Sequence, residues 1–356
     1  MSERASLTNS GSVTDQPPTV PPTAAPPARR RRRWRRILLI CLLVLVVLVA
    51  GTVGGVAWYL HSVESSVARV NAFSDIPAQS RPQKEPVAAG AENMLILGSD
   101  SRDPNNTSGS RSDTIILAHL PKGQGSAQLV SIPRDTWTHI PRSKDGRNGN
   151  TTAKINAAYA WGGIPLVVQT VESFTGVRID HVVVVDFGGF KEIIDALGGV
   201  DIDVEQSFTT KYGFNGYRTF QKGMQHMDGA AALDYSHERH AFADGDFARI
   251  RHQQQMIKAV LDKAASAGLL TDPGKLNAFL RATAKAVSVD QTLSIVDTAM
   301  QLRHLRSGNL TFATNPSSGT GTVGNQSVVF ANTARDKTLY DAVRRDAVPD
   351  ILAAMK

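Results

Sequence analysis

One uncharged apolar segment limits where the rest of this chain can fold. Residues 37–60 contain no charged side chain, and they directly follow seven arginines between positions 29 and 36. A helix needs about 20 apolar residues to cross a bilayer, and flanking arginines favour the cytoplasmic side. The pattern predicts a single-pass helix in the cell membrane, with a cytoplasmic N-terminus and everything from about residue 61 outside the cell.

A cleaved signal peptide is the alternative interpretation of this segment. Gly55-Val56-Ala57 loosely resembles a small-residue cleavage site. However, the apolar run is longer than the 7–15 residues of a usual signal core, and a long region precedes it. A retained anchor is therefore favoured. Since no ATP is available outside the membrane, any chemistry there must use an energy source that is already present.

The positive charge of the chain is concentrated beside the apolar segment. Residues 1–36 hold eight arginines and two acidic residues, which accounts for +6 of the formal net charge of +7. The rest is nearly neutral, so contact with membrane lipid explains the basic arm better than nucleic-acid binding or transcriptional control. We expect a membrane lipid partner and no nucleic acid.

Cysteine and histidine usage argues against a zinc or iron–sulfur centre. Cys41 is the only cysteine and lies within the apolar segment, so the outer part has no disulfide and no cysteine-based metal site. His237 and His240 are three residues apart, whereas the zincin signature requires four. The chain also lacks a Walker loop, a Gly-x-Ser-x-Gly turn and a Gly-x-Gly-x-x-Gly motif.

Composition divides the chain into four parts. Residues 1–36 are rich in proline, threonine and serine, which predicts a disordered cytoplasmic tail that is basic at its end. Residues 37–60 form the predicted anchor, and the proline-containing polar stretch 61–90 is interpreted as a tether. Residues 91–356 are long enough for one extracytoplasmic catalytic domain with a sizeable core.

Short apolar runs alternate with helical patterns in the predicted domain. Buried strands are expected at 93–98, 114–118, 128–132, 181–186, 200–204 and around Phe312. Helices are expected at 190–197, 228–236, 246–267, 273–286, 291–306 and 336–355. Strands interleaved with helices predict an α/β fold whose largely covered sheet carries helices on both faces.

Charged residues gather where the predicted strands end. Asp100 follows the first strand, Arg111 and Asp113 lead into the second, and Arg134 closes the third. Ligands of open α/β sheets bind beyond strand ends. Two carboxylates suit Mg²⁺, and arginines have the fork geometry that matches phosphate. Simple ion pairing at loop ends is the alternative for any single residue, but it does not explain three such clusters.

A second group of polar residues surrounds the start of the helix at 246. Arg249 and Gln253 are four apart and share a helix face, with His252 close to Arg249 and Arg239 shortly before them. The first turn of a helix also offers backbone N–H groups that favour anions. A solvated helical face beginning at an N-cap-like Asp246 is the alternative interpretation.

The ordered set of motifs resembles the LytR-CpsA-Psr family of Gram-positive cell envelopes. The similarity covers about 90–265, and its matching stretches are Asn93–Arg102, Arg111–Thr114, Ser131–Asp135, Lys154–Tyr159 with Gly162-Gly163, Asp186–Asp203, and Gly223 through Gln254. The resemblance implies an α-β-α sandwich with a central mixed sheet and a hydrophobic cavity for a polyprenyl chain. Met256, Ile257, Val260 and Leu261 recur at helical spacing and are candidates for its wall or for ordinary core.

The resemblance also implies an activity and a site. Family members are transferases that move a glycopolymer from a polyprenyl-pyrophosphate donor to peptidoglycan, leaving a phosphodiester link in cell-wall biogenesis. The implied metal ligands, for Mg²⁺ or Mn²⁺, are Asp100 and Asp113. The implied pyrophosphate-binding residues are Arg111, Arg134, Arg239, Arg249 and Gln253. The implied catalytic residues are Arg134, Asp135, Arg239 and Arg249.

Two positions depart from the family pattern. Many members carry arginine where this chain has His237, and often where it has His252. A histidine is charged only below a pKa near 6.5 unless its surroundings shift it, so a phosphate contact here is expected to be weaker or pH-dependent. Two other functions remain open: a hydrolase acting on polyprenyl pyrophosphates at the same site, and a non-catalytic protein that binds envelope polymers.

Overall fold

The computed structural model describes the chain from residue 54 onward, with gaps. The described residues are 54–55, 58–100, 110, 112–123, 125–210, 214, 216–266, 272–348 and 351. The predicted tail 1–36, nearly all of the predicted membrane segment 37–60, and Arg111 lie outside these residues. No helix within the described part is both long and apolar enough to cross a membrane.

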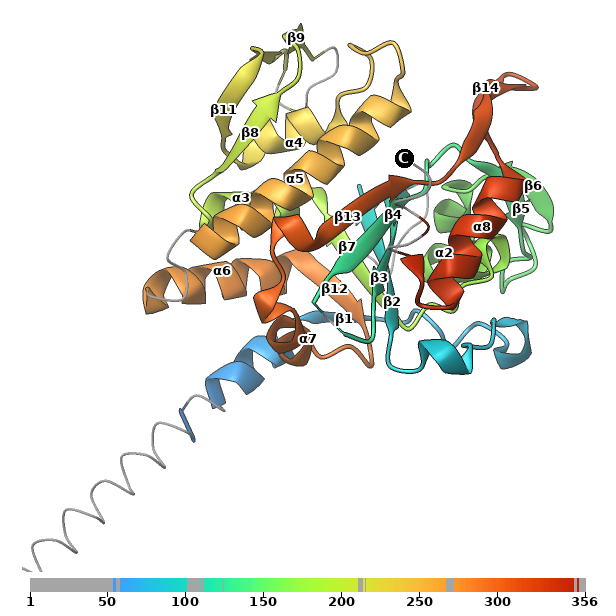
Figure 1. Cartoon of the computed structure of the whole chain (residues 1–356), viewed down its shortest axis with the longest axis horizontal. Coiled ribbons are helices and arrows are strands. Elements are labelled where there is room, and N and C mark those ends of the chain that lie inside the picture. The colour runs from blue at the N-terminus through green and yellow to red at the C-terminus, as the bar shows by residue number, and fades with distance from the viewer. Residues whose placement is uncertain are drawn as a thin grey trace, which may run out of the picture. The chain divides into compact units, whose positions relative to one another are not determined.

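A seven-stranded mixed sheet forms the centre of the domain (Figure 1). In spatial order its strands are β1 (Ala68–Val70), β12 (Val287–Asp290), β7 (His181–Asp186), β2 (Glu92–Ser99), β3 (Ser112–Leu120), β4 (Ala127–Ser131) and β13 (Leu310–Thr314). The pairs β1–β12, β7–β2 and β4–β13 are parallel, and the others are antiparallel. The expected α/β fold with a central mixed sheet is confirmed.

Helices cover both faces of the sheet because its strands bury apolar side chains on both sides. Leu95 and Leu97 pack into a core with α2 (Ala157–Thr175) and α8 (Thr333–Arg344). Met94 and Ile116 pack on the other side with α5 (Asp246–Ser266), α6 (Pro273–Ala286) and α7 (Ile295–Gln301). Alternate residues of β2 thus enter opposite layers, as a strand requires.

A third apolar cluster lies beside the second core. It joins α3 (Phe187–Ala196), α4 (Gly229–His237) and α5 to the pair β8 (Val200–Val204) and β11 (Gly223–Met227). Smaller elements are the hairpins β5 (Trp137–Ile140) with β6 (Thr151–Lys154), β9 (Phe208–Thr209) with β10 (Thr219–Phe220), and β14 (Ser317–Val323) with β15 (Gln326–Ala331). Four 3-10 turns are η1 (Ala78–Ser80), η2 (Pro86–Ala88), η3 (Leu302–His304) and η4 (Ser307–Asn309).

The segment 61–90, interpreted as a tether, is part of the folded domain in the structure. Residues 59–65 are helical, β1 pairs with β12 at the edge of the main sheet, and Val63, Val67 and Val70 are buried. These valines are separated by serine, glutamate and arginine, so the segment looks polar on average. Neither β12 nor the β14–β15 hairpin was expected, because each is short or rich in glycine and serine.

Strand register brings the polar strand ends to one edge of the sheet. Ser99 at the end of β2 pairs with Ser112 of β3 and with Asp186 of β7. The amide of Ile132, just after β4, donates to the carbonyl of Ile115 at 2.8 Å. Asp100, Asp113 and Arg134 therefore all belong to this edge, where ligands of open α/β sheets bind.

Backbone hydrogen bonds fix the segment that carries Arg134. The amide of Asn156 donates to the carbonyl of Arg134 at 3.2 Å, and the amide of Ile155 donates to that of Thr136 at 2.8 Å. On the other side, the amide of Val329 in β15 donates to the carbonyl of Asp135 at 2.9 Å. Residues 134–136 are thus held between the start of α2 and the β14–β15 hairpin.

Candidate active site

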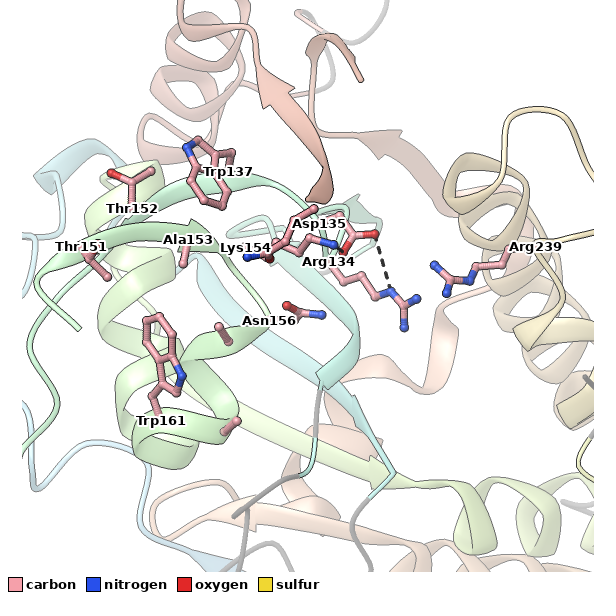
Figure 2. A pocket seen from close by; sticks show the side chains of 13 residues that line it. Arg134, Asp135, Trp137, Thr151, Thr152, Ala153, Lys154, Asn156, Trp161 and Arg239 are labelled. Carbon is pink, nitrogen blue, oxygen red and sulfur yellow. Dashed lines mark ion pairs between the residues drawn. The ribbon is translucent and has the colours of Figure 1, made fainter. Parts of the chain in front are cut away.

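Arg134 lies at the centre of a group of three carboxylates. Its Nη1 atom is paired with Asp113, and its Nε atom lies 3.7 Å from Asp246 Oδ1 and 3.9 Å from Asp135 Oδ2. The side chain is only 11% exposed. Figure 2 shows its guanidinium facing Arg239 across an opening. A buried guanidinium among carboxylates stays charged, and the pKa of Arg134 is raised because these acids outweigh the effect of burial.

Arg249 and Asp246 form a second buried pair, one helical turn apart on α5. Arg249 Nη2 lies 2.6 Å from Asp246 Oδ1, and the Arg249 side chain is 3% exposed. Burial raises the pKa of Asp246, although Arg249 and Arg134 partly oppose that rise. Burial lowers the pKa of Arg249, with Asp246 opposing. The Nε atoms of Arg134 and Arg249 are buried without a hydrogen-bond acceptor in the described structure. Buried donors are usually satisfied, so a bound ligand that accepts hydrogen bonds from these two Nε atoms would explain them.

A small polar pocket of about 180 Å³ lies among these arginines. Its lining residues are Asp113, Arg134, Phe214, Asp234, His237, Glu238, Arg239, His240 and Arg249. The Asp234 carboxylate already has partners outside the pocket lining or in its backbone: it accepts hydrogen bonds from Arg218 Nε at 3.0 Å and from the amide of Phe214 at 2.9 Å. Three guanidinium groups around one pocket repel each other, so an anion placed between them gains from all three.

A larger apolar cavity of about 580 Å³ adjoins the polar pocket. It lies between the sheet and the helices α3 and α5, and its wall includes Phe190, Met256, Ile257, Val260 and Leu261. His237 lines both the cavity and the polar pocket, which makes the two spaces neighbours. An empty apolar space of this size suits a hydrocarbon chain, since filling it removes apolar surface from water.

His237 is neutral at the boundary between these two spaces. Its Nδ1 atom lies 2.9 Å from the carbonyl oxygen of Leu233, and its ring packs edge-on against Phe187 at 4.3 Å between centroids. Burial, together with the nearby positive charge of Arg249, lowers its pKa. At this position, where the resemblance implies arginine in many members, the chain therefore presents an uncharged ring at neutral pH.

His252 lies in the core and does not line the polar pocket. Its side chain is fully buried and stacks on Tyr235, with 4.2 Å between ring centroids. Burial lowers its pKa to about 4. The expected pH-dependent phosphate contact therefore has no support at this position, because the ring is both neutral and enclosed by aromatic side chains.

The two candidate metal ligands lie at the same end of the β2–β3 pair. Asp100 is one residue beyond Ser99, which pairs with Ser112 beside Asp113. Burial would raise the pKa of Asp113, but Arg134 and Arg249 outweigh it and hold that pKa below its usual range. Among the residues described, no three histidine, cysteine or acidic side chains form a metal cluster. Two carboxylates completed by water and ligand oxygens are nevertheless a donor set that fits Mg²⁺.

The structure brings together most, but not all, of the candidate residues. Arg134, Arg239 and Arg249 share the polar pocket with Asp113, and Asp135 lies beside it. Gln253 instead lines the apolar cavity, and Arg111 lies outside the described residues. The sequence predicted only a capping role for Asp246. Its position three residues before Arg249 was the available signal, since such pairs meet on one helix face.

Comparisons with known proteins identify the family of this chain. A model described as the LytR_cpsA_psr family matches residues 58–344, so the chain belongs to this family, as the motifs indicated. The chain is 34% identical over 233 residues to the polyisoprenyl-teichoic acid–peptidoglycan teichoic acid transferase TagU of Bacillus subtilis, covering 64% of this chain and 70% of that relative.

Two further relatives extend the comparison. The cell wall biosynthesis protein LcpA of Corynebacterium glutamicum is 31% identical over 308 residues, which cover 74% of this chain but only 57% of LcpA. The crystal structure of TagV from Bacillus subtilis is similar with a TM-score of 0.60 at 27% identity, covering 72% of this chain and 97% of TagV. The fold and the family are thus shared with envelope proteins of two different bacteria.

Proposed function

We propose that this chain is a phosphotransferase that moves a glycopolymer from a polyprenyl-pyrophosphate carrier to peptidoglycan. The observation that carries the proposal is the contact between an apolar cavity of about 580 Å³ and a pocket lined by Arg134, Arg239 and Arg249. A lipid diphosphate has the same two parts, a hydrocarbon chain and a compact polyanion. The names of the relatives TagU and LcpA support an envelope polymer as cargo.

In the proposed reaction a peptidoglycan hydroxyl attacks the phosphorus nearest the sugar. A new oxygen–phosphorus bond forms, while the bond from that phosphorus to the bridging oxygen breaks. The bridging oxygen leaves with its electron pair as polyprenyl phosphate, and the hydroxyl proton passes to the Asp135 carboxylate and then to water. Arg134, Arg239 and Arg249 stabilise the charge on the phosphate oxygens, which is the main demand of phosphoryl transfer.

Asp100 and Asp113 are the residues proposed to hold a divalent cation. When bound, Mg²⁺ or Mn²⁺ supplies positive charge next to the diphosphate oxygens. Asp113 fits this role because the neighbouring arginines keep its pKa low, so the carboxylate is ionised at neutral pH. Arg134, Arg239 and Arg249 line the same pocket as Asp113, so a cation held there would neutralise the diphosphate together with the guanidinium groups.

The proposed location is the outer side of the cell membrane, with residues 37–60 as the single anchor. Its basic flank at 29–36 would contact anionic lipid on the cytoplasmic side. A polyprenyl carrier lies in the same bilayer, so an anchored enzyme meets its donor at the membrane surface. The energy-rich pyrophosphate of that donor supplies the free energy that ATP cannot supply outside the cell.

A reconstituted transfer reaction tests this proposal. The full-length protein in detergent is given a polyprenyl-pyrophosphate donor with a labelled glycopolymer, together with peptidoglycan and Mg²⁺. We expect label to become covalently attached to peptidoglycan, to stop doing so when EDTA is added, and to resume with excess Mg²⁺ or Mn²⁺. Release of labelled polymer phosphate regardless of peptidoglycan would instead indicate a hydrolase. Binding without any turnover would indicate a polymer-binding protein.

A further inference from the structure

A second cleft opens on the other side of Arg134 and Arg239 (Figure 2). Its volume is about 530 Å³, within the range of roughly 300–1,000 Å³ that small-ligand sites occupy. It shares Arg134 and Arg239 with the polar pocket, but no residue lines both this cleft and the apolar cavity. The polar pocket therefore lies between two spaces of different chemistry: the apolar cavity, and a cleft lined by aromatic, polar and charged side chains.

Two half-buried indoles give the cleft its aromatic character. Trp137 begins β5, and Trp161 lies on α2 just before the helix breaks at Gly162 and Gly163. Gly163 has a φ of +65°, a conformation that favours glycine, and this break ends the first helical segment directly after Trp161. Figure 2 shows the two indoles on either side of Ala153 and Lys154.

Polar side chains from several separate segments of the chain complete the lining. Lys154 Nζ lies 3.0 Å from Asp135 Oδ1, so this carboxylate is held at the end of the cleft that is nearest Arg134. Asn156 lies at the start of α2, and Gln326 comes from β15, which is bonded to residue 135 through the Val329 amide. Thr151 and Thr152 of β6 add hydroxyl groups to the lining. This combination of indole faces and polar groups suits a carbohydrate, whose rings have apolar C–H faces and polar edges.

The geometry of phosphoryl transfer assigns the direction from which the acceptor arrives. The attacking and leaving oxygens lie roughly in line on opposite sides of the phosphorus. The leaving polyprenyl phosphate must point toward the apolar cavity, because its chain fills that space. The attacking hydroxyl must therefore come from the opposite side of the polar pocket, where the cleft containing Trp137 and Trp161 lies.

We propose that this cleft is the subsite for the peptidoglycan glycan strand, with Trp137 and Trp161 as the faces on which its sugars stack. The inference rests on the proposed transferase function. Asp135 then lies where the cleft meets the phosphate pocket, within reach of an incoming hydroxyl, and Lys154 positions its carboxylate. The donor's own sugars are a second source of carbohydrate, so the test must separate the two.

The test compares Trp137→Ala and Trp161→Ala with wild type in the full-length protein. Transfer rates are measured while the concentrations of a soluble, uncross-linked peptidoglycan glycan and of the lipid-linked donor are varied separately. Loss of one aromatic stacking face is expected to raise KM for the glycan about tenfold, with the KM for the donor unchanged. Trp161→Phe, which keeps an aromatic face, is expected to recover most of the glycan affinity.

Tyr217→Ala is the matched control, because Tyr217 is a largely exposed aromatic residue that does not line the cleft. Calorimetric titration of the same glycan into the protein without donor provides a readout that needs no turnover. It is expected to show the same tenfold weakening in the two tryptophan variants and none in Tyr217→Ala. Thermal melts of all variants establish that each one is folded.

Three results would overturn the inference. The first is an unchanged glycan KM and unchanged glycan binding in folded Trp137→Ala and Trp161→Ala. The second is a rise in the donor KM in place of the glycan KM, which would assign the cleft to the donor's sugars. The third is an equal loss in Tyr217→Ala. If wild type binds the glycan through the tryptophans but transfers nothing, the proposed function fails while the carbohydrate site stands.

Discussion

Replacing Arg249 by alanine is expected to reduce glycopolymer transfer by about 100- to 1,000-fold, the usual cost of removing one preorganised donor from a developing oxyanion. Arg249 is buried, lines the polar pocket and has its Nε atom unsatisfied in the described structure. Its removal takes away both a hydrogen-bond donor and a charge at a buried position, where electrostatic interactions are stronger than in water. Arg134→Ala is expected to lose at least as much, because Arg134 borders both the polar pocket and the cleft that contains Trp137 and Trp161.

The fold is expected to survive the loss of Arg249. Burial already raises the pKa of Asp246, so without its partner this carboxyl takes up a proton and avoids remaining a buried charge. The double variant Arg249→Ala/Asp246→Asn removes the unpaired acid altogether and is expected to be folded but equally inactive. Measuring the transfer rate beside the melting temperature separates loss of chemistry from loss of structure.

Arg251→Ala is the matched control for this experiment. Arg251 lies two residues further along α5, is about two-fifths exposed, and pairs with Asp244 and Glu205 away from the pocket. Its transfer rate is expected to stay near that of wild type. Similar losses in Arg251→Ala and Arg249→Ala would show that general charge on α5 matters, and would contradict the assignment of Arg249 to the phosphate.

Filling the apolar cavity is expected to block the lipid without unfolding the protein. Ile257 lines the cavity from α5, and Ile257→Trp places an indole into space that is otherwise empty. Each buried CH₂ group contributes about 0.8 kcal/mol, so displacing only five of them from the cavity costs about 4 kcal/mol, or roughly a thousandfold in donor affinity. The donor KM measured with a long polyprenyl chain reports this effect directly.

Chain length and position provide the controls for the cavity variant. A donor whose prenyl chain is too short to reach Ile257 is expected to be transferred almost equally well by wild type and by Ile257→Trp. Lys258 is exposed on the same helix, so Lys258→Trp adds the same indole outside the cavity and is expected to change little. If Lys258→Trp weakened the long-chain donor as much as Ile257→Trp, the cavity would not be the lipid site.

Most of the sheet could be predicted from the sequence because its central strands are long apolar runs. The strands expected at 93–98, 114–118 and 181–186 correspond to β2, β3 and β7, with differences of a few residues at their ends. The neighbouring strands β1 and β12 were missed, since a strand of three or four residues lacks the length that makes a pattern visible. Their pairing depends on contacts between residues more than 200 positions apart.

The candidate site was only partly visible in the sequence. The arginines and acids could be found because they follow or precede apolar strands, and strands of one sheet place such ends side by side. The role of Gln253 could not, since its spacing from Arg249 predicts a shared helix face but not that this part of the face borders the apolar cavity. The cleft with Trp137 and Trp161 was also invisible, because it is assembled from a hairpin, a broken helix and the unexpected β14–β15 hairpin.

The central proposal is that the polar pocket and the apolar cavity together bind one lipid diphosphate. The most direct measurement is an experimental structure of the full-length protein with bound polyprenyl pyrophosphate and Mg²⁺. We expect phosphate oxygens within hydrogen-bond distance of Arg134, Arg239 and Arg249, with the prenyl chain running past His237 along Ile257 and Leu261. A prenyl chain bound elsewhere, or a diphosphate with no contact to these arginines, would contradict it.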